Sequence, residues 1–223
     1  TLLEILLRFQ EQGWSVPKVW FYCNQQSAET MDDKEVIKKV YERWYTQERF
    51  ADLWFAPNGK PLITKGWNTV WNENDQLEKT ISETFEFRLR QWPTEAFNDN
   101  GIPWIEFTYP QPVHNGWMNV SVAQHANTVA FSDREKNWGR GYDFATGKND
   151  DEHFREGINF KQQWDTVYGA GDSVQYVFIT GWNEWVAEKM IYNGRIQTVD
   201  QFLCLGIVKF VFGIFAVHGT GIK

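Results

Sequence analysis

The sequence has little positive charge, few cysteines and no glycine-rich phosphate loop, and each shortage removes a class of protein. Its 223 residues carry 22 Lys and Arg against 29 Asp and Glu, a net charge of −7. Such a balance does not favour contact with phosphate backbones, so we expect no nucleic-acid partner. Two cysteines cannot form a disulfide framework, and no Cys or His spacing indicates zinc. We therefore expect neither a metal nor another cofactor.

Aromatic residues, in contrast, are abundant. They make up 17% of the chain and include 13 Trp, whereas the hydrophobic share of 42% and the charged share of 23% are typical of a folded protein. An indole offers a flat apolar face and one N–H donor, which suits packing against sugar rings. The alternative is a hydrophobic core that happens to use tryptophan, and composition leaves both open.

The two ends of the chain are unusual. Residues Thr1 to Gln12 have the apolar stripe of an amphipathic helix that ends near Gly13. Such a helix needs a packing partner, which we expect upstream, in a part of the protein that this sequence does not contain. From Phe202 to Val217 the chain is apolar except for Lys209. A membrane span needs about 20 such residues, so this tail is short for one. A membrane anchor, a buried element and a tail unrelated to the domain all stay open.

Between the ends, short apolar runs alternate with helical segments. The expected helices are Thr30–Tyr45 and Phe154–Tyr168, and the six expected strands are Lys18–Asn24, Pro61–Thr64, Phe85–Leu89, Pro103–Thr108, Val120–Gln124 and Gln175–Thr180. Apolar strands alternating with helices indicate a parallel sheet. We expect one α/β domain over residues 1–200, with 201–223 as a separate tail, and both a parallel barrel and a doubly wound sheet fit. Both architectures place the active site at the carboxyl ends of the strands.

The most informative segment, YVFITGWNEW, ends the last expected strand. Glu184 follows Trp182 and Asn183 and precedes Trp185, so indole rings flank its carboxyl group. Desolvation favours the protonated form of such a group, as a general acid requires, and the Asn183 amide can bind a sugar hydroxyl. The alternative is that Glu184 accepts hydrogen bonds from the indoles and only closes the strand end.

This motif resembles the WNEW motif of barrel proteins related to family-99 and family-71 glycoside hydrolases. The similarity covers about Val16 to Phe202 through an ordered set of segments: DLWFAPNGKPLI, FEFRLRQWP, PWIEFTYPQ, VSVAQHAN, GINFKQQW and VFITGWNEW. The resemblance implies a (β/α)8 TIM-type barrel that is incomplete, with about six of its eight strands present. Where many of these hydrolases carry a second acid, this chain has Ala187, and the next acid, Glu188, would point about 100° away on a helix.

Glycoside hydrolysis usually needs two carboxyl groups, so a partner for Glu184 is required. Glu106 is the first choice because it lies near the carboxyl end of its expected strand. The alternative is that Glu106 forms a buried ion pair with Arg88. Glu86 lies deeper in its expected strand and ranks lower, and Asp143 fits a solvated loop better than a site.

Several other side chains are candidate sugar contacts. Strand alternation places Trp20, Tyr22 and Asn24 on one face. The candidates that follow or end strands are Arg88, Gln124, His125, Trp182, Asn183 and Trp185. For each aromatic residue, core packing is the alternative. Asn119-Val120-Ser121 matches a glycosylation sequon but enters an expected strand, so we expect no modification there.

The sequence therefore predicts a glycoside hydrolase-like protein with a carbohydrate substrate and acid/base chemistry by Glu184 and Glu106. The missing second acid of the motif keeps open a carbohydrate-binding barrel without hydrolysis, and the two unusual ends keep open an inactive gene fragment. The compartment is unknown, although aromatic content and resemblance favour a periplasmic or secreted protein.

We expect Glu184→Gln to abolish turnover of a glycan substrate while largely keeping the fold, because the amide cannot donate the carboxylic proton. Product release and circular dichroism, compared between variant and parent, measure both properties. Unchanged turnover would remove Glu184 from the mechanism.

Overall fold

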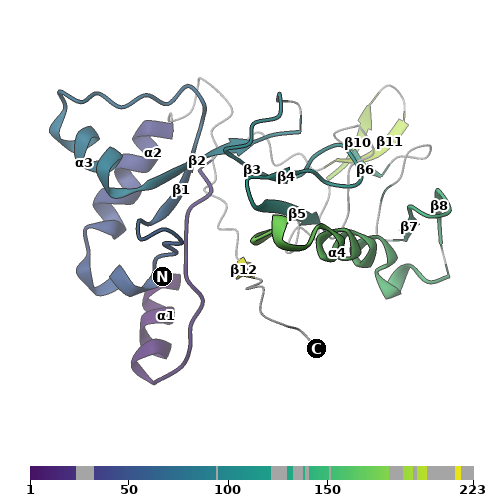
Figure 1. Ribbon diagram of the computed structural model, residues 1–223, viewed down its shortest axis with the longest axis horizontal. Coiled ribbons are helices and arrows are strands. Elements are labelled where there is room, and N and C mark those ends of the chain that lie inside the picture. The colour runs from purple at the N-terminus through teal and green to yellow at the C-terminus, as the bar shows by residue number, and fades with distance from the viewer. Residues whose placement is uncertain are drawn as a thin grey trace. The chain divides into compact units, whose positions relative to one another are not determined.

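The computed structural model describes residues 1–23, 33–93, 95–121, 130–132, 138, 141–150, 152–180, 188–192, 195–199 and 214–216 (Figure 1). The chain divides into two compact units, a first built on Thr1–Arg90 and a second that begins at Gln91. Each unit has helices and short strands of its own.

The first unit is a small helical layer around two parallel strands. Its helices are α1 (Leu2–Glu11), α2 (Asp33–Val40) and α3 (Gln76–Thr84), with a π-helical turn at Tyr41–Tyr45 and a 3-10 helix at Glu48–Leu53; its strands are β1 (Leu62–Lys65) and β2 (Glu86–Gln91). Leu62 of β1 lies opposite Glu86 of β2. The expected first strand makes two single parallel bridges, from Val19 to Trp54 and from Phe21 to Ile63.

The helix α1 and the extended segment before β1 pack their apolar side chains into one hydrophobic core. The apolar stripe of α1 buries Leu3 and Leu6, so the expected N-terminal helix is confirmed. Along the extended segment before β1, Val19, Phe21 and Cys23 alternate into the same core. This follows the two-residue period of extended backbone.

A buried carboxylate joins α2 to α3. Glu78 accepts hydrogen bonds from Lys34 Nζ at 2.6 Å and from Lys38 Nζ at 2.8 Å, both on α2. The backbone N–H of Asn72 donates to the same carboxylate at 2.7 Å. These hydrogen bonds lower the pKa of Glu78 to about 2, so the carboxylate is charged throughout the neutral range.

The second unit contains more strands than helices. Its strands are β3 (Gly101–Pro103), β4 (Val113–His114), β5 (Trp117–Ser121), β6 (Ala130–Ser132), β7 (Tyr142–Asp143), β8 (Lys148–Asn149), β9 (Tyr176–Thr180), β10 (Glu188–Tyr192), β11 (Arg195–Val199) and β12 (Ile214–Ala216). Its one long described helix is α4 (Ile158–Ala170), between 3-10 turns at Phe154–Glu156 and Gly171–Ser173. The largest sheet has the order β12-β9-β5-β4.

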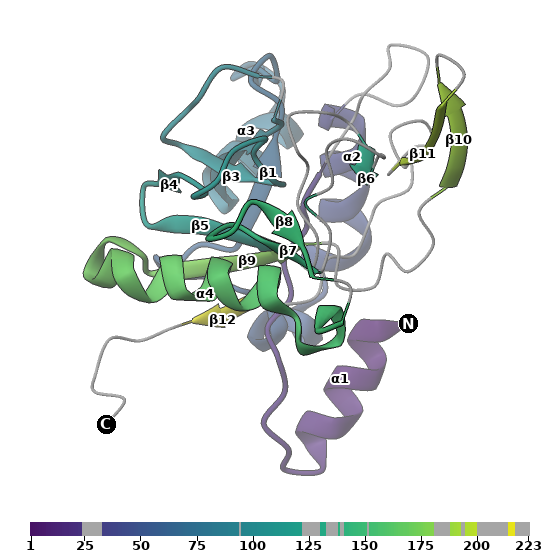
Figure 2. The same ribbon diagram turned by 90° about the vertical axis from the view of Figure 1, so that its right-hand side faces the viewer.

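Helix α4 covers β5 in this unit (Figure 2). Gln163 donates to the carbonyl of Ser121 and accepts from its N–H, both at 2.7 Å. Val167 of α4 packs with Val120 of β5 and Val177 of β9. Strands β5 and β9 are parallel, and the helix α4 that lies between them in the sequence packs on β5.

The expectation of a (β/α)8 TIM-type barrel, even an incomplete one, is wrong. The described strands form sheets of two to four strands. In the largest, β9 is parallel to β5 but antiparallel to β12, and β5 is antiparallel to β4. A parallel barrel needs a parallel neighbour on both sides of every strand. Asn115 and Gly116, with φ of 42° and 83°, form the tight turn that reverses the chain between β4 and β5.

The apolar tail contributes one described element. Strand β12 pairs with β9, Ile214 opposite Phe178. Among the described residues, no helix has the length and apolar character needed to cross a membrane.

We expect Glu78→Gln to lower the free energy of unfolding at pH 7, with the loss shrinking as the pH falls. A carboxylate whose pKa is lower in the folded chain stabilises the fold above its unfolded pKa of about 4.5, and this contribution disappears as the pH falls toward 2. Urea unfolding of both proteins at several pH values measures the difference. Glu83→Gln, an exposed change on the same helix, is the control. A loss of unfolding free energy in Glu78→Gln that does not change with pH would contradict the lowered pKa of Glu78.

Candidate functional site

The described part of the chain contains four of the predicted site residues: Glu106, Trp20, Tyr22 and Arg88. Tyr22 is buried and makes an edge contact with Trp20, their ring centroids 5.9 Å apart, and Arg88 is buried in β2. The remaining predicted residues, Glu184, Trp182, Asn183, Trp185, Asn24, Gln124 and His125, lie outside the described residues. The candidate site is therefore built around Glu106 in the second unit.

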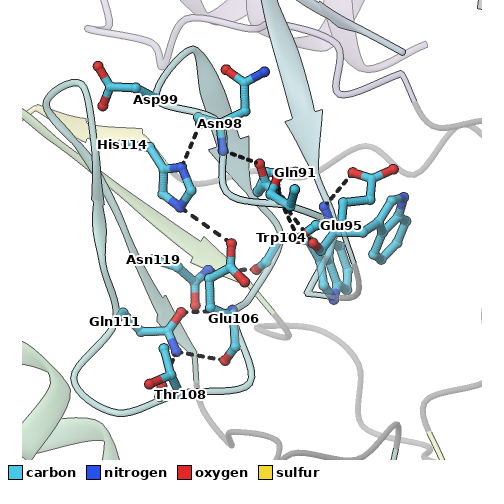
Figure 3. Close-up of polar contacts among 12 residues, drawn as sticks. Gln91, Glu95, Asn98, Asp99, Trp104, Glu106, Thr108, Gln111, His114 and Asn119 are labelled. Carbon is cyan, nitrogen blue, oxygen red and sulfur yellow. Dashed lines mark hydrogen bonds and ion pairs between the residues drawn. The ribbon is translucent and has the colours of Figure 1, made fainter. Parts of the chain in front are cut away.

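Glu106 lies in an irregular loop and not on a strand. The sequence predicted a strand over Pro103–Thr108, but only Pro103 of this segment belongs to a strand, as the last residue of β3. Beyond it, the Gln111 side chain accepts from the Glu106 N–H at 2.9 Å and donates to the carbonyls of Glu106 at 2.8 Å and Thr108 at 2.6 Å (Figure 3). The Gln111 amide thus makes the hydrogen bonds with the backbone of this loop that a neighbouring strand would make in a sheet. It fixes the backbone on both sides of the Glu106 side chain.

The Glu106 carboxylate faces a histidine. His114 Nε2 lies 3.4 Å from Glu106 Oε1; the His114 side chain is fully buried, and the Glu106 side chain is 12% exposed. On the other side of the ring, Nδ1 lies 2.9 Å from the carbonyl oxygen of Asn98. Phe97 stacks on the imidazole with 4.4 Å between ring centroids. The hydrogen bond at Nδ1 and the stacked Phe97 ring thus orient the imidazole.

A second buried amide, Gln91, shapes the turn that carries Asn98. Its Nε2 lies within hydrogen-bond distance of the carbonyls of Trp92, Glu95 and Ala96, and its Oε1 accepts from the Asn98 N–H at 3.0 Å. The Asn98 carbonyl therefore points at His114 from a loop that has little freedom (Figure 3).

A third buried amide connects this loop region to the sheet. Asn119 of β5 is fully buried, and its Nδ2 lies 2.7 Å from the Trp104 carbonyl, 3.0 Å from the Phe178 carbonyl and 2.9 Å from Thr180 Oγ1. Trp104 precedes Glu106 by two residues, and Thr180 is the last residue of β9. We call Gln91, Asn98, Glu106, Gln111, His114 and Asn119 the Glu106 cluster.

This arrangement offers a partly exposed carboxylate at the edge of a mostly buried polar framework. Among the described residues, no group of three His, Cys, Asp or Glu side chains could hold a metal ion. The lower-ranked carboxylates have other partners: Glu86 accepts from Asn58, and Asp143 accepts from Gln162, which lowers the pKa of Asp143.

Sequence reasoning missed His114, Gln111, Gln91 and Asn119 as site residues. The signal for His114 was present: Asn115-Gly116 between apolar residues is a strong hairpin indicator, and it places Val113 and His114 on a strand. No periodic pattern marks the buried amides, because Gln91 and Gln111 bind the backbone of irregular loops close to them in the sequence, and Asn119 binds residues that only the folded chain brings together.

We expect Gln111→Leu to destabilise the chain by about 1–3 kcal/mol, since it removes the hydrogen bonds that Gln111 makes with the partly buried backbone N–H and carbonyl of Glu106. Denaturant unfolding measures the loss, and Gln175→Leu, the same change at an exposed position of the same unit, is the control. Equal effects of the two substitutions would show that the side-chain bonds of Gln111 do not stabilise the loop.

Comparison with known proteins identifies no family. No family model and no solved structure matches the chain. Isoleucine--tRNA ligase from Sulfurihydrogenibium sp. (strain YO3AOP1) is 21% identical over 131 residues, and that from Persephonella marina (strain DSM 14350 / EX-H1) is 21% identical over 126 residues. Each match covers 52% of this chain and 13% of the ligase, so the chain spans about an eighth of the length of these relatives.

Proposed function

We propose that the second unit cleaves a glycosidic bond of a complex glycan by carboxylate acid/base chemistry, with Glu106 and Glu184 as the two carboxyl groups. Two carboxyl groups on opposite sides of the bond are the usual requirement of this reaction. Glu106 supplies one of them from a fixed loop. The aromatic composition of the chain and the WNEW resemblance favour a carbohydrate as the substrate.

The observation that carries this proposal is the position of the Asn119 side chain. Its amide nitrogen bonds the carbonyl of Trp104, two residues before Glu106, and the hydroxyl of Thr180, four residues before Glu184. One buried group therefore ties together the chain segments that lead to the two carboxyl groups. This supports their working as a pair, although they are 78 residues apart (184 − 106).

The surroundings of Glu106 suit such a role. Its loop is fixed by Gln111, so the carboxylate does not have to be ordered when a substrate arrives, and preorganisation of this kind lowers the barrier to reaction. Trp92 is partly exposed and packs on Trp104, which precedes Glu106 by two residues; their ring centroids are 5.9 Å apart. A partly exposed indole is a surface on which a sugar ring can stack.

We expect Glu106→Gln to reduce the release of reducing sugar from a glycan panel by about 100-fold or more, the usual scale of one acid or base group. Glu86→Gln is the matched control, because Glu86 is a carboxylate of β2 in the other unit and accepts hydrogen bonds from the Asn58 side chain. Circular dichroism confirms that both variants fold.

Two outcomes would contradict the proposal. Equal activity of Glu106→Gln and the parent would remove Glu106 from the reaction. Glycan binding by the parent without product at any pH would replace the hydrolase with a carbohydrate-binding protein, the function that Ala187 in place of the second acid of the motif favours.

A further inference from the structure

We infer that the turn after β1, in the first unit, is a binding site for a sugar ring, with the Trp67 indole as the surface on which the ring stacks. The Thr69 N–H donates to the Gly66 carbonyl at 3.2 Å, so Trp67 and Asn68 occupy the two central positions of a β-turn. Trp67 is 75% exposed, and Asn68 is exposed beside it. An indole face and a side-chain amide thus lie together on the surface.

Charged side chains hold both ends of this turn. The Asp33 carboxylate, at the start of α2 and almost fully buried, accepts from the Gly66 N–H at 2.6 Å and lies 3.5 Å from Thr69 Oγ1. Lys65, the last residue of β1, donates from Nζ to the Thr69 carbonyl at 2.6 Å. Arg90 of β2 fixes the carboxylate in its turn, with Nη1 3.1 Å from Asp33 Oδ2. Three elements of secondary structure therefore hold the backbone of the turn in one place.

Gly66 allows the turn to lie this close to the buried carboxylate. A Cβ at this position would be 2.5 Å from Asp33 Oδ2 and 2.9 Å from Asn68 Oδ1. A larger residue would therefore displace either the turn or the carboxylate that holds it. Because the turn is already ordered, little entropy is lost when the indole meets a ligand, and such preorganisation strengthens binding.

The side chains near Trp67 favour a sugar over a protein partner. Val70, 72% exposed, is the other strongly exposed apolar residue of this loop, whereas Asn68, Asn72 and Glu73 are exposed polar residues. A stable protein interface usually buries about 800 Å² on each partner, more than two apolar side chains supply. A sugar ring needs one indole face and a few polar groups for its hydroxyls. The choice of a glycan rests on the proposed function, whereas the anchoring of the indole does not.

A second exposed tryptophan of the first unit provides a matched control. Trp14 is 66% exposed and follows the end of α1, where its ring meets the Phe9 ring edge-on with 6.2 Å between centroids. Trp14→Ala and Trp67→Ala therefore remove the same exposed side chain from the same unit. The second substitution also removes the proposed stacking surface.

Isothermal titration calorimetry of the full chain with hexasaccharides of glucose, mannose, xylose and N-acetylglucosamine tests the inference. The parent should bind at least one of them, and Trp67→Ala should weaken this binding by about 10-fold or more, the scale of removing an interface tryptophan. Trp14→Ala should bind as the parent does. Trp67→Phe should bind more tightly than Trp67→Ala, because it keeps an aromatic face. Urea unfolding should be similar in the parent and these variants, since the changed side chains are exposed.

Gly66→Ala tests the anchoring apart from the indole. This variant keeps Trp67 but forces the turn away from Asp33, so we expect weaker hexasaccharide binding than in the parent. The same titration measures the change, and urea unfolding confirms that the variant folds. Parent-like affinity in a folded Gly66→Ala protein would contradict the role given to the anchored turn.

Unchanged binding by Trp67→Ala, an equal loss in Trp14→Ala, or no binding of any hexasaccharide by the parent would overturn the inference. Failure of the proposed hydrolysis gives a different result. Binding that depends on Trp67, without product release, would leave this site standing and remove the hydrolase. Product release that depends on Glu106 and not on Trp67, in a chain whose binding is also independent of Trp67, would do the reverse.

Discussion

The second unit depends on one buried amide. Asn119 has no exposed surface, and the two hydrogens of its Nδ2 serve three acceptors, the carbonyls of Trp104 and Phe178 and the hydroxyl of Thr180. Because a buried polar group without partners is costly, this amide requires the loop, β5 and β9 to meet in one register. An apolar residue of similar size would tolerate several registers. The position of Glu106 follows from this constraint, since its loop begins at a carbonyl that Asn119 holds.

Much of the local structure was predictable because it depends on short-range patterns. The apolar stripe of α1, the apolar run of β9 and the helix closed near Gly171 each follow from residues that are neighbours in the sequence. The prediction of how the strands are arranged in sheets was wrong. Apolar strands look alike whether their neighbours run parallel or antiparallel, so the pairing of β9 with β12 on one side and β5 on the other could not be read from them.

The site was predictable only in part, for a similar reason. Glu106 was found by residue type and position, but its expected strand is replaced by a loop that the Gln111 side chain stabilises. A single amide five residues downstream, Gln111, produces no periodic pattern in the sequence that would reveal its role. His114 could have been placed on a hairpin strand by Asn115-Gly116, but its contact with Glu106 depends on tertiary packing. The participation of Glu184 stays a prediction.

The parallel pairing of β5 with β9 also has a consequence for how the chain folds. Asn119 and its register partner Phe178 are 59 residues apart, and helix α4 lies between them. Long-range pairing of this kind requires a large loop to close before any contact compensates for the loss of chain entropy. Such pairing therefore slows folding. During synthesis, β5 has no parallel partner until β9 leaves the ribosome. The first unit, whose β1 and β2 are only 24 residues apart in register (86 − 62), can form earlier.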